Sequence, residues 1–365
     1  MNLVILGNSI LPYTSAIFSE LGKLAKVHVL YLSAEDRMYG FAESSNDISH
    51  TYTCSVARSR LVHVPLRDAR IRLPAFAVWQ ELRRLNPDVV FSTSWGAASW
   101  PNITGARAGT WRSVMWAEST SWSSAIRNPL ARWYRRSMVR AFDSYVANGS
   151  QAALAIRDLG AKEERIVISR FASPWQSRVV PARPTRTLSS DARFLFVGRL
   201  IASKHPVEAI VAFSRATRDR PGDRLTIVGD GPLMGDCLKV VRMLGETRIK
   251  FVGRLEGNAL IAQYNTHDIL LCPFEREVWG LVVNEALSYG LFVVASNEVG
   301  SAHDLLSDDN GVMFAANDAY AFGNAIMTSV SRFAQVSKCP LDLGSPQQFA
   351  RDMLHASELA MHGRR

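Results

Sequence analysis

Two carboxylates stand eight positions apart in the segment EVWGLVVNE, with a glycine between them. Glu277 opens this segment and Glu285 closes it. The residues up to Gly290 predict a short helix that begins just after Gly280, so Glu285 lies inside the helix and Glu277 in the loop before it. Because ionised carboxylates accept hydrogen bonds from hydroxyl groups, both acids can contact one polar ligand.

The start of this predicted helix offers a second feature, its free amide groups. The first N–H groups of a helix have no acceptor within the helix and favour a bound anion. Gly280 has no side chain, so an anion can approach the amides of Leu281 and Val282 closely. Phosphate is the natural ligand. In a purely structural alternative, Glu277 complements the helix dipole and Glu285 is a solvated helix residue.

From Glu285 the chain continues as EALSYGLFVVAS, and the whole pattern resembles the E-x7-E donor-site signature of family 4 retaining glycosyltransferases. The resemblance implies that Glu277 contacts the hydroxyls of the transferred sugar. It also implies that Glu285 holds the ribose of the nucleotide. A vicinal diol offers two donors to one carboxylate, which agrees with both roles.

The segment VGRLIASKHPVEAI resembles the G-R-L-x(n)-K segment of the same family, with Gly198, Arg199 and Lys204 at the matching positions. The resemblance implies that Arg199 and Lys204 bind the diphosphate of the sugar nucleotide. Independently of the family, a guanidinium and an ammonium at one strand end suit a diphosphate. A single arginine or lysine is more often a solvated surface charge.

Two further segments, IVGDGP and IKFVGRL, resemble the strand-to-loop turns that line the nucleotide in this family. They place Gly229 beside the donor and the backbone near Arg254 beside its base, without distinguishing uracil from guanine. Glycine and proline form turns in any protein, so these segments support the fold more than the chemistry.

The front half departs from the family pattern at two places. Ser15 and Ala16 stand where the family usually has a glycine pair against the donor diphosphate. Either the Ser15 hydroxyl replaces that amide contact, or the front loop stands further away from the donor. Glu118 is the nearest match to the histidine that many members place near the primary hydroxyl of the sugar. Glu118 either binds the acceptor, braces the sugar or is an N-cap or loop acid in solvent.

Short apolar runs alternate with helical spacing along the chain and predict twelve strands in two halves. They are residues 3–6, 27–32, 89–92, 113–116, 145–147 and 166–168, then 194–197, 225–228, 249–252, 269–272, 292–295 and 312–314. This pattern predicts an α/β fold with two doubly wound parallel sheets, which are Rossmann-like domains facing across a cleft. The resemblance identifies this architecture as GT-B.

The 365 residues are sufficient for two domains. We expect an N-terminal, acceptor-binding domain over residues 1–180 and a C-terminal, nucleotide-sugar-binding domain over residues 191–345. The proline-containing segment Ser173–Asp191 reads as the linker. A last helix, within residues 346–365, is expected to pack back on the N-terminal domain.

Positive charge is concentrated in the front half. Residues 1–190 hold 24 Lys and Arg against 13 Asp and Glu, and residues 191–365 hold 18 against 20. Such asymmetry indicates an anionic partner. Pro129–Phe142 predicts an amphipathic basic helix, whose partner is either an anionic membrane surface or, as for an ordinary surface helix, the protein core. No nucleic-acid-binding motif is present, so nucleic acid is not expected as a partner.

The remaining composition sets the cellular context that we expect. No apolar run has the length of a membrane span and the N-terminus lacks signal-peptide features, so we expect a cytoplasmic protein, peripheral on the inner face of the membrane if the basic helix binds lipid. The four cysteines have no paired spacing, and the histidines and acids show no ligand pattern. We therefore expect neither metal nor cofactor.

The sequence thus predicts a metal-independent hexosyltransferase of bacterial surface polysaccharide or glycan assembly, with a nucleotide diphosphate sugar as donor and a saccharide or lipid-linked saccharide as acceptor. The front-half tryptophans, at positions 95, 100, 116 and 122, are candidates for the acceptor site, although large aromatics are more often core. A nucleotide-sugar epimerase or a phosphorylase would share the predicted cleft. A non-catalytic membrane-docking protein of the same fold is the alternative from another class.

Overall fold

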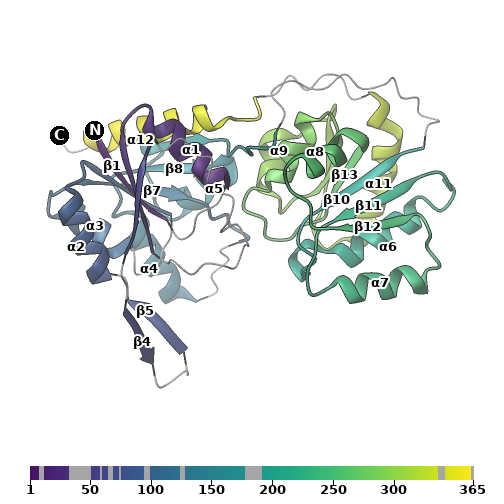
Figure 1. The fold of residues 1–365 in the computed structure, drawn as a ribbon, viewed down its shortest axis with the longest axis horizontal. Helices are drawn as coiled ribbons and strands as arrows, with labels where there is room; N and C mark the ends of the chain where they lie inside the picture. Colours follow the sequence, from purple (N-terminus) through teal and green to yellow (C-terminus); the bar gives the residue numbers. More distant parts are fainter. Residues whose placement is uncertain are drawn as a thin grey trace. The chain divides into compact units, whose positions relative to one another are not determined.

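The computed structural model describes residues 1–7, 12–32, 51–57, 60–64, 69–73, 75–93, 99–123, 128–176, 191–335 and 342–362. The chain divides into two compact units (Figure 1). Unit 1 consists of Met1–Pro174 and Gly344–Arg365, and unit 2 consists of Trp175–Leu343. Most of the expected linker, residues 177–190, lies outside the described residues.

In the described residues, unit 1 is built on a parallel sheet of seven strands in the order β3-β2-β1-β6-β7-β8-β9. The strands are β1 (Asn2–Gly7), β2 (Lys26–Tyr31), β3 (Thr53–Val56), β6 (Val89–Ser92), β7 (Arg112–Ala117), β8 (Ser144–Asn148) and β9 (Ile166–Ser169). Six of them confirm predicted strands. The sequence analysis missed β3, an edge strand whose residues are mostly exposed, because it carries no buried apolar run.

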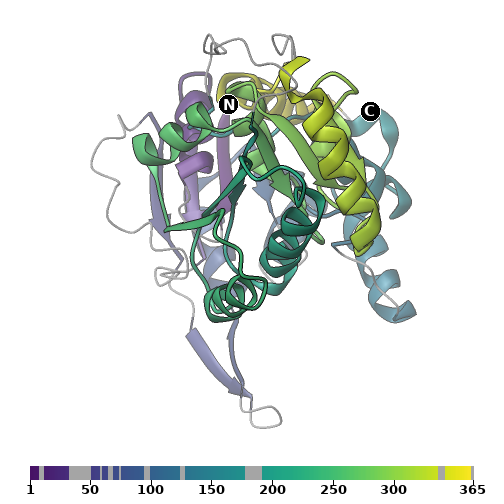
Figure 2. The same cartoon turned by 90° about the vertical axis from the view of Figure 1, so that its right-hand side faces the viewer.

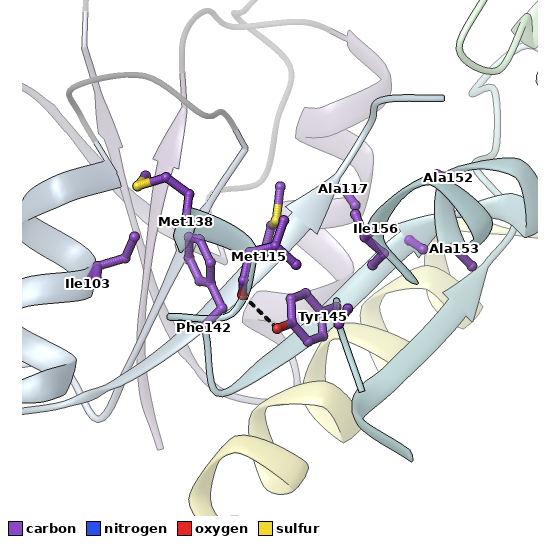
Figure 3. Close-up of a cluster of buried hydrophobic side chains, with 12 residues drawn as sticks. Ile103, Met115, Ala117, Met138, Phe142, Tyr145, Ala152, Ala153 and Ile156 are labelled. Atoms are coloured by element: carbon purple, nitrogen blue, oxygen red, sulfur yellow. Dashed lines mark hydrogen bonds between the residues drawn. The ribbon is translucent and has the colours of Figure 1, made fainter. Parts of the chain in front are cut away.

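Helices cover both faces of this sheet. They are α1 (Pro12–Gly22), α2 (Ala75–Leu85), α3 (Ser99–Arg107), α4 (Pro129–Val139), α5 (Gly149–Asp158) and α12 (Pro346–His362). Successive side chains of β7 point to opposite faces, as in any strand. Met115 and Ala117 join a buried cluster with residues of α3, α4 and α5 (Figure 3), whereas the Trp116 ring contacts Phe18 of α1 and Phe349 of α12.

The cluster in Figure 3 also fixes where α4 ends. Tyr145 of β8 lies in the cluster and its Oη donates to the Val139 carbonyl at 2.7 Å, which gives the buried phenol a partner. The predicted helix extended to Phe142, but α4 ends at Val139 and the chain then makes tighter turns, with Phe142 N donating to the same carbonyl. The predicted end was wrong because Phe142 lies beyond the end of the helix. Its side chain is buried there, although helical spacing no longer applies.

The last helix, α12, belongs to unit 1. It packs against α1, β7, β8 and β9, and Figure 1 shows it, in yellow, beside the purple α1. Ser144 Oγ of β8 donates to the Ala356 carbonyl at 2.7 Å, and Phe349 is fully buried. The C-terminal segment therefore completes the core of the N-terminal unit.

A two-stranded antiparallel hairpin extends from the body of unit 1 in both views (Figures 1 and 2). It consists of β4 (Arg60–Val64) and β5 (Ala69–Leu73), with Val62 opposite Ile71 in register. The sequence analysis did not predict it. Basic and apolar residues alternate in Ala69–Leu73 but not in Arg60–Val64, so the sequence shows no clear hairpin pattern.

Unit 2 is built on a parallel sheet of six strands in the described residues, in the order β12-β11-β10-β13-β14-β15. The strands are β10 (Arg193–Val197), β11 (Arg224–Val228), β12 (Ile249–Gly253), β13 (Ile269–Cys272), β14 (Phe292–Ser296) and β15 (Gly311–Phe314). All six confirm predicted strands. The strand order reverses between β10 and β13, and ligands of such sheets bind beyond the carboxyl ends of the strands at this switch point.

In the described residues of unit 2, each strand is followed by a helix. These helices are α6 (Pro206–Ala216), α7 (Met234–Met243), α8 (Gly257–Thr266), α9 (Leu281–Ser288), α10 (Gly300–Leu305) and α11 (Ala319–Arg332). Helix α6 packs against α7 and α11, while α9 packs against β13, β14 and α10. Across the part of the chain that the structure describes, no helix has the length and apolar character needed to cross a membrane.

Candidate active site

The carboxyl ends of β10 and β13 bring together the residues that the sequence analysis selected in unit 2. Arg199 follows β10 and is exposed, and Lys204 ends a short 3-10 turn, Ala202–Lys204. Glu277 lies in the loop after β13 and Glu285 lies in α9, which starts at Leu281 as predicted. Because β10 and β13 are adjacent and parallel, their two loops leave the same edge of the sheet.

Lys204 and Glu277 contact each other directly. The Lys204 Nζ donates to Glu277 Oε2, and the same ammonium lies 3.8 Å from the centroid of the Phe274 ring. The two charged side chains are 15% and 25% exposed, so the pair is shielded more than a surface ion pair. The carboxylate and the ring together hold the ammonium in one place at the strand edge.

Gly280 gives the loop before α9 its path. Its φ of 90° is in the left-handed region, and a Cβ there would lie 3.0 Å from Val299 Cγ1. Ser301 Oγ donates to the Gly280 carbonyl at 3.1 Å, which fixes the peptide. Leu281 and Val282 are both partly buried. Their amides therefore lie in the first turn of the helix, next to the Glu277 loop.

Glu285 is held inside unit 2 by tyrosines. Its side chain is 3% exposed, and its Oε2 accepts a hydrogen bond from Tyr264 Oη at 2.6 Å. The Tyr264 ring stacks on Tyr289 at 5.6 Å, and Tyr289 Oη donates to the Trp175 carbonyl at 3.0 Å. Burial and the neighbouring Glu285 raise the pKa of Tyr264 well above its usual value. Glu285 is thus a positioned buried acid, and the alternative of a solvated helix residue is wrong.

Glycines allow close backbone contacts between the loops at this edge of the sheet. A Cβ on Gly229, whose φ is 145°, would lie 1.9 Å from the Gly198 carbonyl oxygen. A Cβ on Gly198 would lie 3.2 Å from the Phe274 ring. Both predicted donor-site glycines therefore have a packing reason of their own. Arg254 is exposed, and its Nε donates to Glu256 Oε1 at 2.8 Å.

The two front-half candidates lie in unit 1. Ser15 of α1 is 3% exposed, and its Oγ has no hydrogen-bond partner among the described residues. Glu118 directly follows β7 and is partly buried. Burial raises the pKa of Glu118 to about 7, and a side-chain hydrogen bond with Asn148 opposes part of this shift. Glu118 is therefore not the freely solvated loop acid of the structural alternative.

The front-half tryptophans have different environments. Trp116 is 1% exposed, and its Nε1 donates to Asn148 Oδ1 at 2.7 Å, so it is a core residue and the acceptor-site prediction was wrong for it. Trp100 of α3 is 46% exposed and its ring lies 6.1 Å from that of Tyr134 on α4. Trp122 is partly buried in a turn, and position 95 lies outside the described residues.

Sequence reasoning missed two supporting residues, Phe274 beneath Lys204 and Tyr264 beside Glu285. Phe274 ends an ordinary buried apolar run, and Tyr264 lies 21 positions before its partner. No local pattern marks either contact. Among the residues that the structure describes, no group of three or more His, Cys, Asp or Glu side chains has a geometry for a metal ion.

Residues 183–332, less than half of the chain, match the family described as Glycosyl transferases group 1. Among curated proteins, glycogen synthase of Mycobacterium tuberculosis is 28% identical over 257 residues, which cover 67% of this chain and 60% of that protein. The similarity thus spans less than two thirds of the length of this relative.

Two solved structures share the fold over almost the whole chain. WaaB, a galactosyltransferase of the lipopolysaccharide outer core, has a TM-score of 0.74 at 16% identity, over 98% of this chain and 99% of WaaB. HepE of Anabaena, solved with UDP-glucose, has a TM-score of 0.66 at 17% identity, over 98% and 100%. The chain therefore has the GT-B architecture of two parallel-sheet α/β domains.

The raised pKa of Glu118 predicts how stability depends on pH. Since the folded state keeps the Glu118 proton up to about pH 7 and the unfolded state loses it near pH 4.5, this group's contribution to stability is present below about pH 4.5 and is lost as pH rises through 7. Glu118→Gln removes the titrating carboxyl group and therefore this loss of stability. At pH 8 we expect the variant to be more stable than wild type by about 1–3 kcal/mol, allowing for partial exposure, with little difference at pH 4.

Denaturant unfolding at several pH values, followed by tryptophan fluorescence, measures this difference. Glu164→Gln is the control, since Glu164 is an exposed acid of the same unit. A stability difference for Glu118→Gln that stays constant from pH 4 to pH 8 contradicts the assignment of a raised pKa.

Proposed function

We propose that this protein is a retaining glycosyltransferase that moves a hexose from a nucleotide diphosphate sugar to a saccharide or lipid-linked saccharide acceptor. The observation that carries the proposal is the Lys204–Glu277 pair at the switch point of the unit 2 sheet. A cation for the diphosphate and an acid for the sugar hydroxyls thereby stand side by side. The group 1 match over residues 183–332 and the UDP-glucose bound by the structurally similar HepE support this proposal.

The departing diphosphate determines where positive charge is needed. Breaking the glycosidic bond leaves negative charge on the diphosphate and oxocarbenium character on the sugar. In the proposed mechanism, Arg199, Lys204 and the first amides of α9 stabilise the growing negative charge. These side-chain and backbone groups would provide the stabilisation that a divalent cation gives in other enzymes, so we propose a metal-independent reaction.

The two acids have separate proposed roles. Glu285, oriented by Tyr264, accepts hydrogen bonds from the ribose hydroxyls, and Glu277 accepts them from the sugar. The backbone around Gly229 and Arg254 lines the nucleotide. We propose attack of the acceptor on the same face from which the diphosphate leaves, with a donor phosphate oxygen taking the acceptor proton, because no carboxylate stands out as a nucleophile.

Unit 1 has the proposed acceptor-binding role. Ser15 contributes a buried hydroxyl without a protein partner among the described residues, and Glu118 contributes a carboxyl that is partly protonated near neutral pH. Both follow strands of the unit 1 sheet on its carboxyl-end side, where ligands of parallel sheets bind. We propose that they contact the acceptor or the transferred sugar.

Helix α4 offers a surface for an anionic membrane. Met138 at its end is buried, but Leu130 is 74% exposed and Trp133 68% exposed, beside the exposed Arg132. An exposed tryptophan and leucine among arginines suit the boundary between lipid headgroups and acyl chains. We propose that α4 docks the protein on acidic lipid, peripherally on the inner face of the membrane, where a lipid-linked acceptor would be available.

The proposed donor predicts nucleotide-dependent stabilisation. A ligand that binds only the folded state raises the melting temperature, so one of UDP, GDP, ADP and TDP should raise it in a thermal-shift screen. Glu285→Gln should reduce this shift, because the ribose loses a charged acceptor. Asp219→Asn, which removes an exposed acid of unit 2, should leave it intact. If none of the four nucleotides shifts wild type, the proposed donor class is wrong.

The proposed charge stabilisation predicts the kinetics of Arg199→Ala and Lys204→Ala. Both variants lose a donor to a charge that is largest in the transition state, so kcat should fall on the order of a hundredfold at saturating donor, with little change in folding stability. Lys239→Ala and Arg218→Ala remove exposed cations of the same unit and serve as controls. Wild-type turnover in either test variant would remove that residue from the mechanism.

The proposed docking helix predicts salt-sensitive lipid binding. Each basic residue near an acidic surface contributes about 1 kcal/mol, less as salt screens the attraction. Replacing Arg132, Arg135, Arg136 and Arg140 with glutamine should release the protein from acidic liposomes in a cosedimentation assay and leave nucleotide binding intact. The pair Arg132/Arg136→Gln should have a larger effect than Arg83/Arg84→Gln on α2. Equal effects, or wild type in the supernatant at low salt, would exclude docking through α4.

A further inference from the structure

Two residues with strained backbones lie in the loops that hold Lys204 and Glu277. His205 has φ 49° and ψ 48°, and Arg276 has φ 54°, both in the left-handed region that residues with a Cβ rarely adopt. Among the described residues the other non-glycine residues with positive φ are Asn86 and Asn317, and asparagine tolerates this conformation best. Strain of this kind persists where the surrounding contacts require it.

His205 is the more strained of the two because Pro206 follows it. A residue before proline favours an extended backbone, since the proline ring crowds it in other conformations. His205 is the residue between the 3-10 turn that ends at Lys204 and Pro206, the first residue of α6. The backbone dihedrals of His205 therefore set the direction of the chain between the 3-10 turn that contains Lys204, called the Lys204 turn below, and helix α6.

Three successive residues in and directly after the Lys204 turn contact the loop after β13. The Ser203 carbonyl accepts a hydrogen bond from Glu275 N at 2.8 Å. Lys204 donates to Glu277. The His205 Nε2 lies 3.5 Å from Glu275 Oε2. We call these contacts together the loop clasp.

The imidazole of His205 lies between two carboxylates. Nδ1 is 3.4 Å from Glu208 Oε1 of α6, on the side opposite Glu275. The His205 side chain is 19% exposed, and its Nε2 is buried and makes no hydrogen bond among the described residues. A glycine would adopt this backbone without strain. The imidazole thus lies between two carboxylates although the backbone of His205 is strained.

We propose that His205 is a positioning residue for Lys204, which keeps the Lys204 turn against the loop after β13 so that the ammonium faces the donor diphosphate. This inference rests on the proposed function of the same site. The imidazole lies between Glu208 on α6 and Glu275 on the loop, and Lys204 directly precedes His205 in the chain. Without the imidazole, the loop clasp keeps the contacts of the Ser203 carbonyl and the Lys204 side chain.

The test compares His205→Gly, His205→Asn and the control Asn317→Gly. Glycine removes both the strain and the imidazole, and asparagine keeps a polar side chain that tolerates the left-handed backbone. Asn317 is an exposed left-handed residue of the same unit, outside the loop clasp. The three proteins therefore separate relief of strain from loss of the imidazole.

Two readouts are measured for each protein. The first is hydrogen exchange of the Glu275 amide without ligand, because this amide donates across the loop clasp. The second is kcat and the dissociation constant for whichever of UDP, GDP, ADP and TDP stabilises wild type. We expect His205→Gly to accelerate exchange of the Glu275 amide and to lower kcat about tenfold or more without lowering the melting temperature. His205→Asn should change the exchange rate of the Glu275 amide and kcat less than His205→Gly does. Asn317→Gly should change neither quantity.

The outcomes distinguish this inference from the proposed function. Unchanged exchange of the Glu275 amide in His205→Gly overturns the positioning role, whatever the activity. Faster exchange with unchanged kcat and unchanged nucleotide affinity also overturns it, because the loop clasp would then not serve Lys204. If wild type binds none of the four nucleotides, the proposed function fails, and the exchange data alone decide whether His205 joins the two loops.

Discussion

The contact between Lys204 and Glu277 joins two loops whose residues are 73 positions apart in the chain. It exists because β10 and β13 are adjacent and parallel, so their carboxyl ends meet at one edge. The ammonium and the carboxylate neutralise each other in a partly buried place. An anion that binds Lys204 has to compete with Glu277. In the proposed function, its arrival frees the carboxylate to accept hydrogen bonds from the sugar hydroxyls, so the two halves of a sugar nucleotide are recognised together.

Backbone packing at the same edge explains why glycine recurs there. The Gly198 carbonyl fills the space that a Cβ on Gly229 would need, and the Val278 carbonyl does the same at Gly300. Larger residues would push the loops apart and move Arg199, Lys204 and the start of α9 away from one another. Main-chain contacts therefore determine the positions of the loops at this edge of the unit 2 sheet. The charged side chains belong to these loops.

The sequence was sufficient to predict the strands of unit 2 and the start of α9, because fully buried parallel strands and a glycine before a helix leave strong local patterns. It was not sufficient for β3, whose exposed edge residues lack such a pattern, or for the end of α4. Burial of Trp116 against Phe349 joins two segments far apart in the chain, which no local pattern reports. The site was predictable as a set of residues, but the contacts of Lys204 with Phe274, and of Glu285 with Tyr264, depend on tertiary packing.

Helix α12 has a consequence for how the chain is made. The ribosome synthesises unit 1 first, yet Phe349, which packs against Trp116 in its core, emerges only after all of unit 2. During synthesis the face of the sheet that α1 and α12 share stays incomplete and keeps apolar surface exposed. Unit 2, whose residues are contiguous, has its whole sequence available earlier. The order in which the two units reach their final folds is thus expected to be the reverse of their order of synthesis.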